Sequence, residues 1–277
     1  MASPDAARRL IVNADDFGRS HSINQAVLRA HRDGILTTAS LMVNEPALDE
    51  AVAVAKENPR LGVGLHLTLI CGHSALSRKE IPGLIDAENR FSNAPAGTGL
   101  RYFAQKKLRP QLRNELAAQF ARFRATGLKL DHVNGHLHLH LHPVVFRLLM
   151  EHAKEWGITH LRLTRDPLRL NLRLAAGQWR YRFGHAFLFQ WLSCWARPAL
   201  RRRRIRHPDR VFGLLQNANV DETFLTRLLG RLPAGDSELY SHPSLDEFKN
   251  ELEALVSPRV KALVAAQGIR LIRYQDL

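Results

Sequence analysis

Short apolar runs alternate with amphipathic stretches along the chain, and this alternation predicts strands and helices in turn. The expected strands are residues 10–12, 35–44, 61–69, 128–134, 158–164, 211–216, 238–241 and 269–272. The expected helices are residues 20–31, 46–56, 111–126, 143–156, 221–232 and 245–267, the last of them interrupted at Pro258. The two element types alternate about seven times, which favours a parallel α/β architecture.

Several predicted helices begin and end at residues suited to those positions. Ser20 is a suitable N-cap and Pro143 a suitable first-turn residue, while Gly127 and Gly157 fit the position just after a helix. One long segment, residues 70–108, is rich in Gly, Pro and Ser and is expected to form loops over one face of the molecule.

Polar side chains that could bind a metal or transfer protons recur at or just after the carboxyl ends of the predicted strands. They are Asp15, Asp16, His66, His136 and His242. In (β/α) barrels and open α/β sheets this is the end at which active sites are built. No glycine-rich dinucleotide or phosphate-binding motif occurs in the chain, so a nucleotide site is not expected.

The densest chemical signal is residues 131–143, which read DHVNGHLHLHLHP. If this stretch were an extended strand, four imidazoles would share one face, namely those of His136, His138, His140 and His142. Imidazole is a common transition-metal ligand and a proton carrier near neutral pH, so the cluster suggests a metal or catalytic centre. The alternatives are a plain surface strand and adventitious metal binding by a His-rich tract.

A carboxylate with two imidazoles is a common ligand set for a divalent ion that keeps open positions for water and substrate. Asp15 and Asp16 would point to opposite sides of a regular strand, so they need distinct roles unless the strand has already turned. The alternative is that both acids cap the helix beginning near Ser20. His66, between two leucines, and His242, before a proline, are each weak signals alone.

Composition bounds the class of protein. A chain of 277 residues with 45% apolar residues can bury a sizeable core, and we expect one domain over residues 1–277. No apolar run reaches ~18 residues, so no membrane span is expected, and the N-terminal MASPDAARR lacks a signal-peptide pattern. Two widely separated cysteines indicate a reducing compartment. We therefore expect a cytoplasmic protein.

The net charge of +14 is concentrated in one segment. Residues 165–206 hold eleven arginines and a single acidic residue, which amounts to +10 of that charge. The same segment is rich in aromatic residues, and a helix over residues 183–200 would place Phe187, Trp191 and Trp195 on one stripe. This combination resembles a helix that lies on an anionic membrane.

Three interpretations of this basic aromatic insertion remain open. It can be a membrane-surface lid that admits a lipid-linked substrate, a lid packed on the barrel or on a second subunit, or a nucleic-acid-binding segment. Nucleic acid is not the expected partner, because the charge is confined to one insertion without a nucleic-acid-binding motif. The residues expected to form the membrane or lid surface are Trp191, Trp195, Arg201, Arg202, Arg203 and Arg204.

Four motifs together resemble the YdjC-like carbohydrate deacetylases: VNADDFG, GLHLTL, HVNGHLHLH and the later SHP. The resemblance runs nearly from end to end. It implies an irregular (β/α) barrel of about seven strands, similar to polysaccharide deacetylases. It also implies removal of the N-acetyl group from amino sugars with the help of a divalent metal ion.

Carried over residue by residue, the resemblance implies that Asp16, His66 and His136 bind the metal, with Mg and Zn both acceptable. Asp15 would be the general base and His242 the general acid for the departing amine. The division of tasks between Asp15 and Asp16 stays open. His138 and His140 are expected to line the substrate pocket or to support it.

The chain departs from the family pattern at one position. Asn134 stands where many members have Asp in an H-x-D-x-H pattern. Asn cannot be a charged partner of a ligand, but it can orient an imidazole or contact substrate. The change resembles the branch of the family associated with hopanoid lipid biosynthesis.

The sequence therefore predicts an N-deacetylase acting on an N-acetylglucosamine group, attached to a lipid such as a hopanoid. A soluble chitooligosaccharide deacetylase and a non-catalytic metal- or lipid-binding protein are the alternatives. An anionic membrane surface, on the inner face of the cytoplasmic membrane, and a second copy of the chain are the candidate partners.

Overall fold

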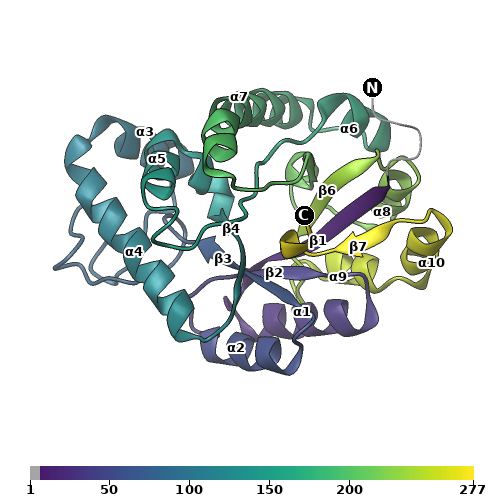
Figure 1. Cartoon of the computed structure of the whole chain (residues 1–277), viewed down its shortest axis with the longest axis horizontal. Coiled ribbons are helices and arrows are strands. Elements are labelled where there is room, and N and C mark those ends of the chain that lie inside the picture. The colour runs from purple at the N-terminus through teal and green to yellow at the C-terminus, as the bar shows by residue number, and fades with distance from the viewer. Residues whose placement is uncertain (1–6) are drawn as a thin grey trace.

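The computed structural model describes residues 7–277 as an α/β fold built on a curled, seven-stranded parallel sheet (Figure 1). Residues 1–6, part of the N-terminal stretch without a signal-peptide pattern, lie outside this range. The strand order is β4-β3-β2-β1-β6-β5, and β7 pairs with β1. The strands are β1 (Arg8–Phe17), β2 (Thr38–Leu41), β3 (Gly62–Leu67), β4 (Leu130–Gly135), β5 (Arg210–Phe212), β6 (Gly235–Ser241) and β7 (Arg270–Ile272).

The two edges of the sheet are linked by residues 158–165. The Val133 N–H of β4 donates to the His160 carbonyl at 3.0 Å, and the Arg162 N–H donates back to the Val133 carbonyl at 3.0 Å. The Val211 N–H of β5 in turn donates to the Arg165 carbonyl at 3.0 Å. The predicted irregular barrel is thus present as a curled sheet whose edge strands share this one connecting segment.

Helices surround the sheet on both sides. In Figure 1, α1 and α2 lie below the strands and the long α7 lies above them. The helices are α1 (His21–Asp33), α2 (Leu48–Glu57), α3 (Pro95–Ala104), α4 (Arg109–Ala125), α5 (Pro143–Glu151), α6 (Leu168–Leu174), α7 (Trp179–Arg203), α8 (Glu222–Leu229), α9 (Lys249–Val256) and α10 (Pro258–Ala266). Four short 3₁₀ segments are η1 (Lys106–Leu108), η2 (His136–Leu141), η3 (Leu214–Gln216) and η4 (Tyr274–Asp276).

Most predicted elements are present, with three corrections. The predicted strand at residues 158–164 makes only isolated bridges, because its backbone bonds first with β4 and then with residues 206 and 211 and does not run along a single strand. The predicted strand at 211–216 ends at Phe212 and turns into η3. The expected loop segment 70–108 contains α3 and η1. The break predicted at Pro258 is confirmed, since α9 ends at Val256 and α10 begins at that proline.

The central strand β1 is buried along most of its length. All eight of its residues from Leu10 to Phe17 are buried, as expected for a parallel strand covered on both faces. The apolar members, such as Leu10 and Val12, join the main hydrophobic core. The polar ones, Asn13, Asp15 and Asp16, are buried toward the carboxyl end, so the functional groups sit on the best-supported strand.

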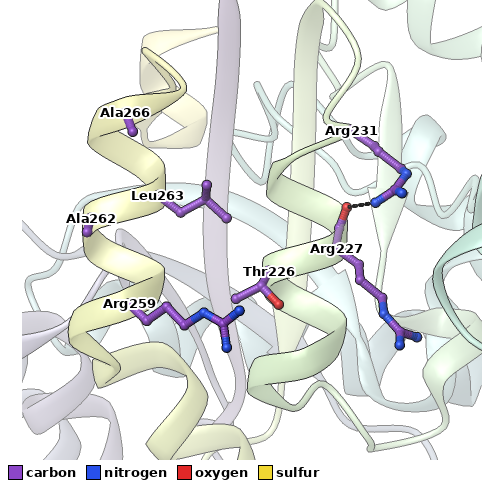
Figure 2. A pocket seen from close by; sticks show the side chains of 7 residues that line it. All are labelled: Thr226, Arg227, Arg231, Arg259, Ala262, Leu263 and Ala266. Atoms are coloured by element: carbon purple, nitrogen blue, oxygen red, sulfur yellow. Dashed lines mark hydrogen bonds between the residues drawn. The ribbon is translucent and has the colours of Figure 1, made fainter.

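Two observations concern the helices outside the sheet. A groove between α8 and α10 is lined by Arg227, Arg231 and Arg259 with small and apolar residues (Figure 2), and its lining contains no carboxylate or imidazole. Among residues 7–277, no helix combines the length and the apolar character needed to cross a membrane.

Candidate metal centre and active site

A bulge in β1 places two neighbouring carboxylates on the same side. The pairing of β1 with β2 shifts register between Ala14 and Phe17, and Asp16 takes a left-handed conformation with φ 64°. Bulges re-aim side chains in this way. As a result both Asp15 and Asp16 approach the His66 ring, with oxygen–nitrogen distances of 3.9 and 3.3 Å. The strand does not turn before the acids, because β1 continues to Phe17, and the irregularity at Asp16 is what departs from a regular strand.

His66 is held with one ring nitrogen free. Its Nδ1 lies 2.7 Å from the side-chain amide oxygen, Oδ1, of Asn134 on the neighbouring strand β4. An amide oxygen can only accept, so Nδ1 carries the proton and Nε2 keeps its lone pair. The buried Nε2 has no hydrogen-bond partner. Asn134 therefore fixes the tautomer that a metal ion requires.

The histidine run does not form an extended strand. β4 ends at Gly135, and Leu137 and His138 both have positive φ, at 49° and 56°. The chain therefore turns immediately after His136, and the prediction of four imidazoles on one face is wrong. His142 instead caps α5, where its Nδ1 accepts from the Val144 N–H at 3.3 Å.

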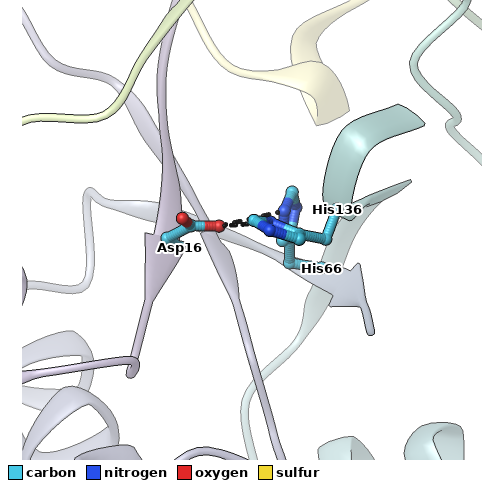
Figure 3. A group of neighbouring side chains, drawn as sticks. All are labelled: Asp16, His66 and His136. Carbon is cyan, nitrogen blue, oxygen red and sulfur yellow. Dashed lines mark hydrogen bonds and ion pairs between the residues drawn. The ribbon is translucent and has the colours of Figure 1, made fainter. Parts of the chain in front are cut away.

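His136, at the first position after β4, completes a three-residue cluster with Asp16 and His66 (Figure 3). Its Nδ1 lies 2.9 Å from Asp16 Oδ1, and one ligand atom from each residue lies within 4.8 Å of the others. Burial alone would raise the pKa of Asp16, but the two imidazoles hold it well below its usual value. An ionised carboxylate, a free Nε2 and a second imidazole fit a divalent metal ion.

Asp15 is held by a buried arginine. Arg162 is fully buried and donates to both oxygens of Asp15, at 2.6 and 3.0 Å, and to Glu238 at 3.0 and 2.7 Å. Burial would raise the pKa of Asp15, but the Arg162 guanidinium holds it far below its usual value. Two further amides, from Asn13 and Asn134, donate to Asp15 Oδ1 at 2.8 and 3.1 Å. Asp15 is thus a fixed anion beside the Asp16–His66–His136 cluster, not a helix cap.

His242 follows β6 and faces the same pocket. Its Nδ1 lies 4.0 Å from the fully buried Glu251 carboxylate of α9, and its backbone N–H donates to that carboxylate at 2.5 Å. The side chain keeps 26% exposure, so it can reach both the pocket and solvent.

These groups lie at the base of a pocket of about 740 Å³ at the carboxyl ends of the strands, a size typical of small-molecule sites. His138 lines the pocket and contacts the Tyr240 hydroxyl at 2.9 Å. Burial, and to a smaller extent the positive charge of Arg162, keeps the pKa of His138 well below its usual value, so this ring is neutral. His140 and Asn134 are fully buried and do not line the pocket, so their positions fit support of the site and not direct substrate contact.

Sequence reasoning missed the arginine and the acids that organise the site. Arg162 lies between two leucines in a predicted strand, and Glu238 opens another, so both resembled ordinary alternating positions. The signal was available in principle, because strands of a parallel sheet are buried on both faces and a charge there needs a partner. Glu251 gave no signal, since it shares its helix with another acidic residue, Glu253.

The predicted lid surface lies on α7. The helix is longer than expected, and Trp191 and Trp195 are exposed on it, as are Arg201, Arg202 and Arg203, with Arg204 at its C-cap. Trp191 also lines the pocket described above. The helix is attached to the body by a buried face that includes Phe189 and Leu192.

Comparison with known proteins identifies the family. The YdjC-like protein family model matches residues 9–266, the region that contains every element of the site. The chain belongs to the YdjC-like family. Two relatives called carbohydrate deacetylase match the YdjC-like chain over 97% of its length. The Geobacillus stearothermophilus protein is 29% identical and covered over 98%, and that of Clostridium beijerinckii is 29% identical and covered over 100%.

A shorter match and one solved structure add to these comparisons. A carbohydrate deacetylase of Brevibacillus brevis is 42% identical over 150 residues, which are 54% of this chain and 57% of that protein. An Enterococcus faecalis crystal structure, to which cellobiose-phosphate cleavage has been ascribed, has a TM-score of 0.75 at 22% identity and covers 98% of this YdjC-like chain and 99% of its own. At this identity the structural match establishes the fold.

Proposed function

We propose that this YdjC-like protein is a metal-dependent hydrolase that removes the N-acetyl group from an N-acetylglucosamine moiety. The observation that carries the proposal is the Asp16–His66–His136 cluster at the base of a pocket, with Asp15 and His242 facing the same space. Full-length relatives called carbohydrate deacetylase support the reaction class.

The donor set bears on the metal. One carboxylate and two imidazoles suit a transition ion such as Zn²⁺, whereas Mg²⁺ prefers oxygen ligands and retained water. We therefore propose Zn²⁺ or a similar ion over Mg²⁺. When bound, such an ion lowers the pKa of a water molecule and polarises the acetyl carbonyl.

The protein residues supply the proton transfers. Deacetylation breaks the amide C–N bond, adds the oxygen of water to the acetyl group, and delivers a proton to the sugar nitrogen. In this proposal Asp15, held ionised by Arg162, accepts the proton of the water. Glu238 shares Arg162 and so offsets part of the attraction that would weaken Asp15 as a base. His242, beside Glu251, is the group that we propose protonates the leaving nitrogen.

The pocket mouth supports a lipid-linked substrate, for which a hopanoid-type glycolipid is our proposal. Its rim is largely apolar and includes Leu137, Leu188 and Trp191, which are exposed to solvent at 50%, 47% and 56%. A free chitooligosaccharide, the rival substrate, would leave these side chains in water. With a lipid-linked substrate we also propose that the protein works in the cytoplasm, attached to the inner face of the membrane.

The experiment is free-amine release measured on two substrates, an N-acetylglucosaminyl lipid and a chitooligosaccharide, before and after metal removal and reloading with Zn²⁺ or Mg²⁺. We expect activity with Zn²⁺ and preference for the lipid. His136→Ala should lose metal and activity, whereas Asp15→Asn should keep the metal and lose activity. Activity that survives both metal removal and Asp15→Asn would show that the mechanism is wrong.

A non-catalytic metal-binding protein is the alternative from another class. The arrangement of Asp15 argues against it, because metal binding alone gives no use for a second carboxylate held by four hydrogen-bond donors from Arg162, Asn13 and Asn134. Metal binding by the wild type without amine release from either substrate would favour this alternative.

A further inference from the structure

The outer face of α7 is unusual for a helix on the surface of a protein. Of the ten large apolar side chains exposed among residues 7–277, six lie on this helix. They are Trp179, Phe183, Phe187, Leu188, Trp191 and Trp195. A surface helix normally turns a polar face to water, and a contiguous apolar patch of this kind marks an interaction site.

This exposed face is not the side of the helix that stabilises the fold. Phe189, Leu192 and Ala196 form a separate buried stripe against the barrel, and Phe187, the most exposed of the aromatic residues, remains 79% accessible. The helix thus has two apolar sides, of which the folded chain uses one. The second is not covered by any other part of residues 7–277.

The charges around this face indicate what the partner is. No acidic residue occurs in α7, and exposed arginines lie at both ends of the aromatic stretch: Arg180 at the start, and Arg201 and Arg202 in the last turn. At 3.6 residues per turn, Arg180, Phe187, Trp191 and Arg202 fall on the same side of the helix. Aromatics at headgroup depth, flanked by cations, match the surface of a bilayer that contains anionic lipid.

The exposed face of α7 adjoins the mouth of the pocket. Leu188 and Trp191 belong to the exposed face and also line the pocket that contains the Asp16–His66–His136 cluster. Leu137, at the turn directly after the ligand His136, is half exposed at the same mouth. A surface that touches these residues also touches the entrance of the active site.

We infer that the outer face of α7 lies on an anionic lipid bilayer and turns the mouth of the pocket toward it. The inference rests on the proposed function only for the identity of the molecule that enters the pocket. The headgroup of a glycolipid could then reach the Asp16–His66–His136 cluster while its apolar part stays in the membrane. Neutral glycans also stack on aromatic residues, but they offer no partner for the arginines.

The test is co-sedimentation of the full chain with phosphatidylcholine vesicles and with vesicles that contain about a quarter phosphatidylglycerol. We expect binding to the anionic vesicles alone at low salt. The double variant Phe183→Ser/Phe187→Ser removes two exposed rings that do not line the catalytic pocket, and Arg201→Glu/Arg202→Glu reverses the nearby charge. Each should reduce vesicle binding about tenfold or more.

The matched control is Arg113→Glu/Arg124→Glu, which reverses two exposed arginines on α4 and should leave vesicle binding unchanged. Amine release from a water-soluble chitooligosaccharide should be unchanged in all three double variants, which shows that each is folded. Equal vesicle binding by the wild type and the Phe183→Ser/Phe187→Ser variant would overturn the inference. A dimer in solution that dissociates in that variant would overturn it as well, because a second copy would then cover the face.

The two proposals fail separately. If the wild type binds anionic vesicles but releases amine from neither substrate, the proposed function fails and the docking surface stands. If it deacetylates but ignores the vesicles, the docking surface fails and the function stands.

Discussion

Asn134 shows how one side chain can serve the metal and the base together. Its oxygen fixes the His66 tautomer, while its nitrogen donates to Asp15 at 3.1 Å and to Ser40 at 2.8 Å. An ionised Asp at this position could accept from His66 but could not donate to Asp15. The amide of Asn134 therefore matters for what surrounds Asp15, while the orientation of the imidazole needs only an acceptor.

We expect Asn134→Ala and Asn134→Asp to separate these two tasks. Asn134→Ala should weaken metal binding by about 10–100-fold, because His66 loses the acceptor that fixes its proton. Asn134→Asp keeps an acceptor, so metal affinity should remain within a few-fold, while repulsion with Asp15 should lower kcat. Metal affinity by competition with a chelator and kcat by amine release are the measurements. Equal loss of both quantities in the two variants would contradict the division.

Arg162 makes a second prediction possible. Removing one member of a buried ion pair typically costs about 3–5 kcal/mol, and Arg162→Met would leave both Asp15 and Glu238 without their cation. We expect a loss of that order in the free energy of urea unfolding. Arg113→Met, at an exposed position on α4, should change it by less than about 0.5 kcal/mol. Adding Glu238→Gln should restore part of the lost stability.

The connection between α6, α7 and η3 depends on a buried acid outside the active site. Asp166 accepts from the Leu215 N–H at 3.1 Å and from the Asn171 amide. Burial raises the pKa of Asp166 to about 7, from 3.8. The folded protein thus holds a proton here across a pH range in which the unfolded chain has released it.

The sign of the resulting pH dependence follows directly. Between pH ~4 and ~7 the folded state binds more protons at Asp166 than the unfolded state, so rising pH lowers stability across that window. From pH 5 to pH 8 the stability of the wild type should fall by about 3 kcal/mol relative to Asp166→Asn. Urea unfolding at both pH values measures this difference. Asp33→Asn, at an exposed acid on α1, should leave the pH dependence unchanged.

How much of each element could be predicted depended on whether its signal was local. The apolar pattern and the helix-ending residues identified β1, β3 and most helices, and Pro258 marked the break between α9 and α10. The turn after β4 was not predictable in this way. His138 and Leu137 adopt positive φ without any glycine, so tertiary contacts such as that of His138 with Tyr240 impose the turn.

The same distinction applies to the site. Asp16, His66 and His136 were suggested by the placement of polar residues at successive strand ends and by the resemblance to a family. Their convergence depends on the bulge at Asp16 and on strand order, which are properties of the assembled sheet. Arg162 was missed because its partners, Asp15 and Glu238, are 147 and 76 residues away along the chain.

The distribution of charge gives the protein a directional response to an electric field. Residues 165–206 carry +10 of the net +14 and include α7, so positive charge is concentrated around this helix. A negatively charged surface would rotate such a molecule during diffusion, before any contact forms. The protein would then reach the membrane with its pocket already facing the lipid, and a larger fraction of collisions would lead to binding.

This orientation makes a kinetic prediction. Salt screens charges over ~10 Å at 0.1 M, so added salt should slow association with anionic vesicles strongly. Dissociation, which depends on withdrawing the rings of Phe187 and its neighbours, should change little. Stopped-flow measurement of both rates over a salt series checks this, and Phe183→Ser/Phe187→Ser should show the reverse pattern: nearly normal arrival and rapid departure.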